Sequence, residues 1–161
     1  MLDLRRFRVI LYVMNRYLDD LKVGDKFETG SAVMTEEAIV DYARQWDPQP
    51  MHLDRAVAER SPYKGIIASG WHTAAMVMKL TAEAKPMGDV EVLGMGVSEM
   101  NWPQPVRPGD TIRVEMAVTG VRPSKSQPSH GIVNFTSTAY NQRGEVVFVV
   151  RPNVWVPRRP G

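Results

Sequence analysis

The chain has 161 residues, 43% of them hydrophobic and 24% charged, and its formal net charge is +2. This length is enough for one domain with a sizeable core, and so small a net charge gives no indication of a nucleic-acid partner. The absence of cysteine excludes disulfide bonds, thiolate metal sites and a cysteine nucleophile, and it fits a reducing cytoplasm.

The first segment of the chain combines three arginines with the apolar run VILYVM, residues 9–14. This run is far shorter than the roughly 20 residues of a membrane-spanning helix, and it is short for the core of a signal peptide. We therefore expect no membrane association. Met14 begins a stretch typical of a domain start, so we expect an N-terminal extension over residues 1–13 and a single domain over residues 14–161. The alternative is that residues 1–13 pack on the domain as a terminal segment.

The segment TEEAIVDYARQW, residues 35–46, predicts an amphipathic helix. Thr35 is a suitable N-cap, two glutamates follow in the first turn, and the apolar residues recur at i, i+3, i+4 and i+7. Pro48 ends the helix, and because the residue before a proline is pushed out of helical dihedrals, Asp47 is expected to turn away from it. We expect Pro50 to keep the following residues extended.

Two further helices are expected in the first half of the chain. DRAVAER, residues 54–60, predicts a short helix that the turn sequence SPYKG ends. A longer helix is predicted from Gly70 to about Ala84. It has few polar residues on any side, so we expect it to be buried. The small residues at its start, Ala68, Ser69 and Gly70, would allow other backbone or a ligand to come close.

The apolar period changes to two after residue 89, which is typical of strands. Strands are expected over residues 94–102, 111–118, 131–141 and 145–156, with an earlier short strand near residues 26–33. About five or six mostly antiparallel strands and one long buried helix make an α+β domain. A sheet wrapped round the helix is the simplest way to bury that helix.

Three segments, YARQWDPQPMHLD, ASGWHT and NWPQPVRPGDTIRVEMAV, resemble the MaoC-type dehydratases, the family of (R)-specific enoyl-CoA hydratases. Asp47 and His52 stand five residues apart, and Gly70 begins the long helix 23 residues after the aspartate. The resemblance covers about residues 16–157. It implies a single hot-dog domain, in which an antiparallel sheet curls round a central helix, and a homodimer or a larger homo-oligomer. It implies an acyl thioester of coenzyme A or of acyl carrier protein as substrate, and no separate cofactor.

The family resemblance also implies roles for particular residues. Asp47 would be the base that activates water, and His52 would orient the water and help to carry the proton to C2. The Gly70 N–H would form the oxyanion hole, at a helix N-terminus where the dipole favours negative charge. Ser69, Trp71 and Pro50 would lie beside the substrate. The predicted function is that of a hydro-lyase, which adds water to a 2-enoyl thioester or removes it from a 3-hydroxyacyl thioester.

Other functions remain open from the sequence. An acyl-CoA thioesterase and a non-catalytic acyl-thioester-binding protein are both compatible with a hot-dog domain. Asp47, His52 and Asp54 could together bind a metal ion, but we expect no metal because the chain has only three histidines and no HExxH pattern. Ser69 could complete a Ser-His-Asp triad, yet it lacks the flanking glycines of a nucleophile elbow. We expect it to be an N-cap or a lining residue.

Several positions depart from the family pattern. Gln49 replaces a common Asn in the acid/base loop, which also has an additional proline, and Ser69 replaces a common His. Met78 stands where some members have a serine that points into the site. These differences leave the acyl specificity open. We expect His72 to be structural or to face a second subunit, and Met76 and Met78 to line the core or an acyl tunnel.

Overall fold

The computed structural model describes residues 14–161, and the predicted extension over residues 1–13 lies outside the described residues. The N-terminal part contains the 3-10 helix η1 (Leu18–Asp20), strand β1 (Lys26–Val33) and helices α1 (Glu36–Trp46), α2 (Pro50–Leu53), α3 (Arg55–Arg60) and α4 (Gly70–Ala84). The C-terminal part contains strands β2 (Leu93–Asn101), β3 (Thr111–Pro123), β4 (His130–Tyr140) and β5 (Val146–Pro157). The α+β class and the five predicted strands are confirmed.

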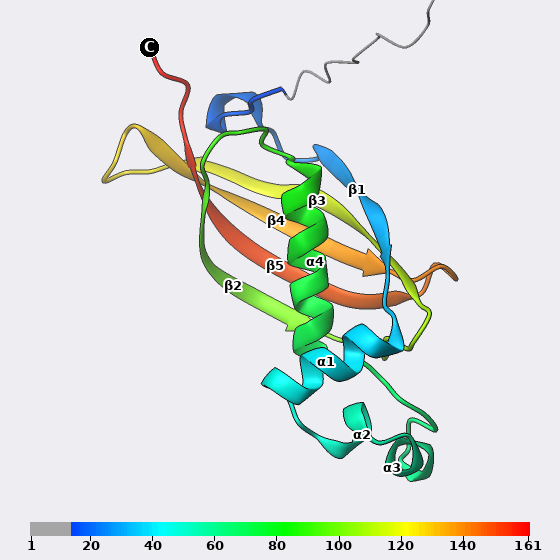
Figure 1. Ribbon diagram of the computed structural model, residues 1–161. Coiled ribbons are helices and arrows are strands. Elements are labelled where there is room, and N and C mark those ends of the chain that lie inside the picture. Colours follow the sequence, from blue (N-terminus) through cyan, green and yellow to red (C-terminus); the bar gives the residue numbers. More distant parts are fainter. Residues whose placement is uncertain (1–13) are drawn as a thin grey trace, which may run out of the picture.

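The five strands form one antiparallel sheet in the order β1-β3-β4-β5-β2. Helix α4 lies across one face of this sheet, and α1, α2 and α3 gather beside the N-terminal end of α4 (Figure 1). The crossover from β1 to β3 carries all four α-helices and β2. This topology brings the loop after α1 close to the start of α4, which positions the residues of the candidate site.

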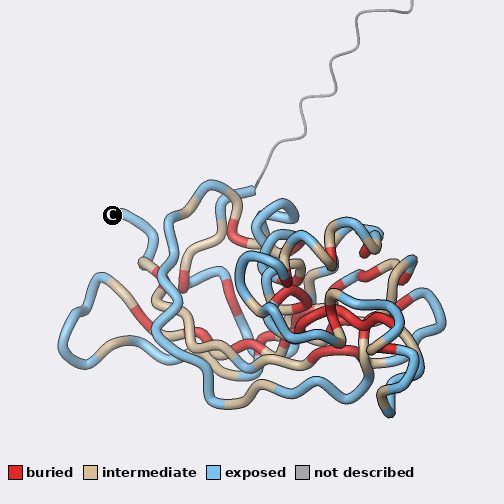
Figure 2. The backbone as a smooth tube through the Cα atoms, turned by 60° about the horizontal axis from the view of Figure 1, so that its bottom comes forward, coloured by how far each residue is buried: buried red, intermediate tan, exposed pale blue. Residues whose placement is uncertain are grey.

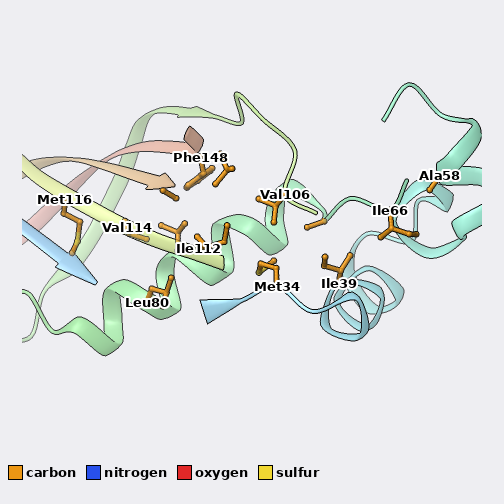
Figure 3. Close-up of a cluster of buried hydrophobic side chains, with 14 residues drawn as sticks. Met34, Ile39, Ala58, Ile66, Leu80, Val106, Ile112, Val114, Met116 and Phe148 are labelled. Atoms are coloured by element: carbon orange, nitrogen blue, oxygen red, sulfur yellow. The ribbon is translucent and has the colours of Figure 1, made fainter. Parts of the chain in front are cut away.

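The main core runs from the space between α4 and the sheet to the helices α1 and α3 (Figure 3). Val114, Ala139 and Phe148 sit opposite one another on three neighbouring strands, and all three are buried. The small alanine between two larger side chains lets Val77 and Leu80 of α4 pack into the same cluster. Alternating burial along β3 and β4 follows from the two-residue period of the strands. Within residues 14–161, buried segments collect in the interior while the outer loops are exposed (Figure 2).

Helix α4 is buried on one face only, which corrects the expectation that it would be buried all round. Thr73, Val77 and Leu80 are buried, whereas Trp71 and Met78 are exposed, with 67% of Met78 accessible. The helical period places the second set on the opposite side from the first. Met78 therefore does not line the core, whereas Met76 packs against the core as expected. None of the helices within residues 14–161 has the length and apolar character needed to cross a membrane.

The N-cap of α1 is confirmed, because the Thr35 side chain accepts a hydrogen bond from the Ala38 N–H. We expect Thr35→Ala to lower the free energy of unfolding by about 1 kcal/mol, since one N–H at the helix start loses its partner. Urea unfolding followed by circular dichroism measures this change. Thr35→Ser keeps the hydroxyl and serves as the control. Equal stability of the alanine variant and the wild type would contradict the capping role.

The loop after α1 differs from the prediction at one point. Pro50 does not keep the chain extended but begins α2 at its first helical position. A proline is tolerated there because its missing N–H would have no partner inside the helix, and its fixed φ suits a helix start. The consequence is that His52 is held on a short helical turn rather than on extended chain.

Candidate active site

Asp47 lies at the C-terminal end of α1, turned out of the helix at φ −152° and ψ 68° as predicted. Its backbone N–H still donates to Ala43. The two carboxylate oxygens accept different hydrogen bonds: Oδ1 accepts from Gln49 Nε2 at 2.8 Å, and Oδ2 accepts from Ser69 Oγ at 2.6 Å. The carboxylate is therefore held in one orientation by residues on both sides of it.

His52 is almost completely buried, with only 3% of the residue accessible. Its Nδ1 lies 2.8 Å from the carbonyl oxygen of Ile67. Because a carbonyl can only accept a hydrogen bond, Nδ1 carries a proton and donates it. Nε2 is then directed at Asp47 Oδ2, at a distance of 3.5 Å. This separation is longer than a good hydrogen bond, so the two atoms face each other without direct bonding.

The hydrogen bonds on Asp47 lower the pKa of its carboxyl group below the ordinary value of 3.8. The largest cause is the hydrogen bond from Ser69, followed by the one from Gln49, and partial burial opposes them. The Coulombic influence of the nearby His52 also lowers this pKa. Asp47 is consequently ionised at neutral pH and acts as a hydrogen-bond acceptor.

Gly70 begins α4 directly beside this pair. Ser69 is the N-cap of the helix, and its Oγ accepts from the Trp71 N–H at 3.2 Å. Among residues 14–161 the Gly70 N–H has no hydrogen-bond partner. A Cβ atom at Gly70 would lie 3.0 Å from the indole of Trp102. The helix thus presents a backbone N–H at its N-terminus, where the dipole favours an anion.

Asp47, His52 and Gly70 all line one cavity of about 430 Å³. Its other walls come from the loops on either side of the site and from the start of α4: Gln49, Met51, Tyr63, Ile67, Ala68, Trp71, Thr73, Trp102, Pro103, Gln104, Pro105 and Val106. The cavity has the size of a small-molecule site, with mostly apolar walls and a few polar groups that converge. An ionised carboxylate, an imidazole nitrogen and an N–H of a helix N-terminus can together handle a proton and stabilise a negative oxygen.

The sequence profile of the MaoC-like domain family matches residues 20–141. The chain belongs to this family. Uncharacterized protein YdeM of Bacillus subtilis is 32% identical over 88% of this chain and 99% of its own length. The crystal structure of a MaoC-like dehydratase from Rhodospirillum rubrum is 43% identical and superposes with a TM-score of 0.84, covering 91% of this chain and all of the other. An (R)-specific enoyl-CoA hydratase from Rhodospirillum rubrum is 26% identical over 89% of this chain and 93% of its own.

The predicted hot-dog fold is therefore confirmed: this MaoC-like domain is a single antiparallel sheet with a helix across it. The predicted site residues come together only in part. Asp47, His52, Gly70 and Trp71 line the cavity, whereas Ser69 is fully buried behind Asp47 and caps α4. Pro50 is outside the cavity wall, to which its neighbours on both sides contribute.

The geometry of this MaoC-like site also bears on the rival chemistries. Asp54 is the N-cap of α3, accepting from the Val57 N–H, so its carboxylate is engaged away from His52. Within residues 14–161 no three His, Asp or Glu side chains are close enough to share a metal ion. Ser69 Oγ donates to Asp47 rather than to the imidazole, which is not the arrangement of a Ser-His-Asp nucleophile.

His72 is buried, in agreement with the structural role that is one of its two expected roles. Its ring stacks on Tyr42 of α1 with 4.5 Å between the ring centroids. Burial lowers the pKa of His72, which keeps the imidazole neutral. The stacked pair holds α1 against α4 and so supports the position of Asp47.

Sequence reasoning missed Trp102 as a residue of this MaoC-like site. The indole Nε1 donates to the carbonyl oxygen of Gly70 at 2.8 Å, and the ring lines the cavity. The available signal was an aromatic residue at the end of a strand, followed by PQP. Spacing along the chain could not show that this residue meets the start of α4, which lies 32 residues earlier.

Proposed function

We propose that this protein is a hydro-lyase that adds water to a 2-enoyl thioester of coenzyme A, or removes water from the corresponding (R)-3-hydroxyacyl thioester. The observation that carries the proposal is the pairing of Asp47 Oδ2 with His52 Nε2, 3.5 Å apart on the wall of a cavity that also holds the N–H of Gly70. The reaction needs a base for water, a proton for C2 and a donor for the thioester oxygen. These three groups can supply them.

The acid/base pair suits a water molecule. With Nδ1 donating to Ile67, the remaining nitrogen of His52 and the ionised carboxylate of Asp47 are both acceptors that face one cavity. One water can donate an O–H to each of them, which directs its oxygen lone pair at C3 of the substrate. Asp47 takes the proton as the C3–O bond forms, and the pair then delivers a proton to C2. Dehydration runs the same steps in reverse.

The Gly70 N–H would stabilise the second half of the reaction. When water attacks C3, the electrons of the C2–C3 double bond move towards the thioester carbonyl and leave negative charge on its oxygen. A fixed N–H at a helix N-terminus needs no reorganisation to accept that charge. When the enolate collapses, C2 takes its proton and the carbonyl is restored.

The similarity to the (R)-specific enoyl-CoA hydratase of Rhodospirillum rubrum supports this proposal and its stereochemistry. The test is to mix purified protein with crotonyl-CoA and to follow the loss of the conjugated enoyl thioester absorbance, with chiral analysis of the product. We expect turnover to the (R)-3-hydroxyacyl thioester. A thioesterase would instead release free thiol from saturated acyl-CoA, and a non-catalytic binder would bind acyl-CoA without turning over any enoyl chain.

The pH dependence of kcat/KM should reveal the effect of the hydrogen bond between Ser69 and Asp47 on the pKa of Asp47. A proton on Asp47 abolishes its action as a base, so activity falls as pH drops through the pKa of this carboxyl. Ser69→Ala removes the largest cause of the lowered pKa, and the acidic limb of the kcat/KM profile should move to higher pH. The stability of the fold should depend on pH in the same direction as the activity. The lowered pKa of Asp47 stabilises the folded protein above the unfolded pKa of 3.8, and this contribution is lost as pH falls through the folded pKa.

A matched control for Ser69→Ala is Thr35→Ala. Both substitutions remove the N-cap of a helix, but only the first removes a hydrogen bond to Asp47. The acidic limb of the Thr35 variant should coincide with that of the wild type. Coincident acidic limbs for all three proteins would mean that Asp47 is not the group whose ionisation limits the rate.

We further propose that the protein is a homodimer that pairs through β2. This strand is at one edge of the sheet, and Leu93, Met95 and Val97 are all exposed on it. A long apolar edge strand is a favourable surface for pairing with another chain. Met95→Lys should give a monomer in light scattering after gel filtration, whereas Val33→Lys on the opposite edge strand β1 should leave the oligomer unchanged. A dimer that survives Met95→Lys but not Val33→Lys would assign the interface to β1.

A further inference from the structure

Trp102 is placed at the junction between the candidate site and the interior of the domain. It directly follows β2, and its indole packs on the first residue of α4. Nε1 donates to the Gly70 carbonyl at 2.8 Å, and a Cβ atom on that glycine would lie only 3.0 Å from the ring. Any group that occupies the cavity next to the Gly70 N–H therefore lies within a few ångströms of this indole.

The indole also abuts the main core. Its ring centroid is 5.4 Å from that of Phe148, which is 1% accessible and belongs to the cluster between α4 and the sheet. Val114 and Phe148 pack in this cluster (Figure 3), and Val77 of α4 belongs to it as well. A long acyl chain that extended from the site towards the interior would have to displace both the indole and these packed side chains.

A second cavity, of about 520 Å³, is also lined by Trp102. Trp102 and Pro103 line both cavities, so the two spaces are adjacent at these two residues. The second cavity is bordered by Glu99 and Arg151, which form an ion pair with 2.8 Å between the charged atoms. Removal of the indole would take away one wall of the first cavity, beside Gly70, and so enlarge the site.

We infer that Trp102 is the end wall of the acyl site and restricts the substrate to short acyl chains, of the size of crotonyl and hexenoyl groups. This inference rests on the proposed function, because it assumes that a thioester carbonyl lies at the Gly70 N–H with C2 and C3 beside Asp47 and His52. From that position the chain beyond C3 meets the indole after a few methylene groups. Trp102 acts on specificity and takes no part in proton transfer.

The test is a chain-length profile of kcat/KM with crotonyl-, hexenoyl-, octenoyl- and decenoyl-CoA. The wild type should prefer the two short substrates. Trp102→Ala and the milder Trp102→Leu should raise the ratio of decenoyl to crotonyl activity by roughly tenfold or more, because each methylene group that a pocket accepts or rejects changes kcat/KM by about tenfold or more. Trp102→Phe retains a ring at the wall and should keep the wild-type order of substrates. Thermal unfolding of each variant checks that it is folded.

Two outcomes would overturn the inference: a wild type that hydrates all four chain lengths equally, or folded Trp102→Leu and Trp102→Ala variants with the wild-type profile. If the wild type hydrates no enoyl thioester, the proposed function fails, and calorimetric binding of butyryl-CoA and decanoyl-CoA then decides the role of Trp102 separately. The wild type should bind butyryl-CoA more tightly, and Trp102→Ala should shift the affinity ratio towards decanoyl-CoA by roughly tenfold. An unchanged ratio, or no binding of either ester, overturns the inference.

Discussion

Asp47→Asn is expected to lower kcat/KM for crotonyl-CoA hydration by about 10²–10⁴-fold, which is the usual contribution of a positioned general base. Asparagine is close in shape to aspartate, so the variant should fold normally. It cannot, however, take a proton from water. Its amide nitrogen is a donor, and it would replace an oxygen that accepts a hydrogen bond from Ser69 or from Gln49. Steady-state kinetics, followed by the decrease in enoyl thioester absorbance, measure this loss of kcat/KM.

Asp54→Asn is the matched control for this variant. It makes the same substitution seven residues further along, at the N-cap of α3, where asparagine caps as well as aspartate. This control should keep wild-type activity and stability. If both variants retain full activity, Asp47 is not the base and the proposed mechanism is wrong.

His52→Ala should cause a loss similar to that of Asp47→Asn, and the double variant should be little worse than either single one. Residues that act on one water as a unit give strongly non-additive effects. Fully multiplicative losses in the double variant would instead indicate that the two side chains act in separate steps. Because His52 is buried and bonded to Ile67, the thermal stability of this variant has to be compared with that of the wild type.

Gly70→Pro is expected to lower kcat/KM by about 10²–10³-fold relative to Gly70→Ala, because proline removes the N–H that would bind the thioester oxygen. The backbone conformation at this position accepts a proline, which makes the comparison possible. Gly70 is the first residue of α4, where proline is well tolerated. Ser69 before it is at φ −53° and ψ 139°, the extended conformation that a residue preceding proline prefers.

Gly70→Ala is the control that distinguishes the loss of the N–H donor from the loss of space beside the indole. Both variants add a Cβ atom that would lie about 3.0 Å from the Trp102 indole, so both require the ring to shift. Only proline also removes the donor. Equal activities of the two variants would show that the N–H of Gly70 does not stabilise the transition state, and that glycine is required there only for close packing.

Local sequence signals predicted the loop that carries the site. Thr35 starts α1, Pro48 ends it, and the restricted residue before that proline turns Asp47 out of the helix. The five-residue spacing to His52 then placed both groups near each other, because a short loop cannot separate them widely. The exception was Pro50, where the same chemical property that excludes proline from helix interiors made it a good helix start.

Contacts between distant segments could not be predicted in this way. The faces of α4 were one example: its sequence is apolar on several sides, and only the position of the sheet decided that Val77 is buried and Met78 exposed. The position of Trp102 was a second example, because nothing in its own segment shows that its indole donates a hydrogen bond to Gly70 and packs against Phe148.

The sequence by itself determined the class of fold, the ends of α1 and α4 and the positions of the strands, since these depend on capping and periodicity. The pairing of an aspartate with a histidine came from the resemblance of this loop to a known family. The tertiary structure alone decided which oxygen of Asp47 faces His52, which nitrogen of the imidazole carries the proton, and which aromatic residue lines the cavity beside Gly70. Those features depend on Ser69, Ile67 and Trp102, which lie from 15 to 55 residues away from the groups they orient or enclose and reach them only after the chain has folded.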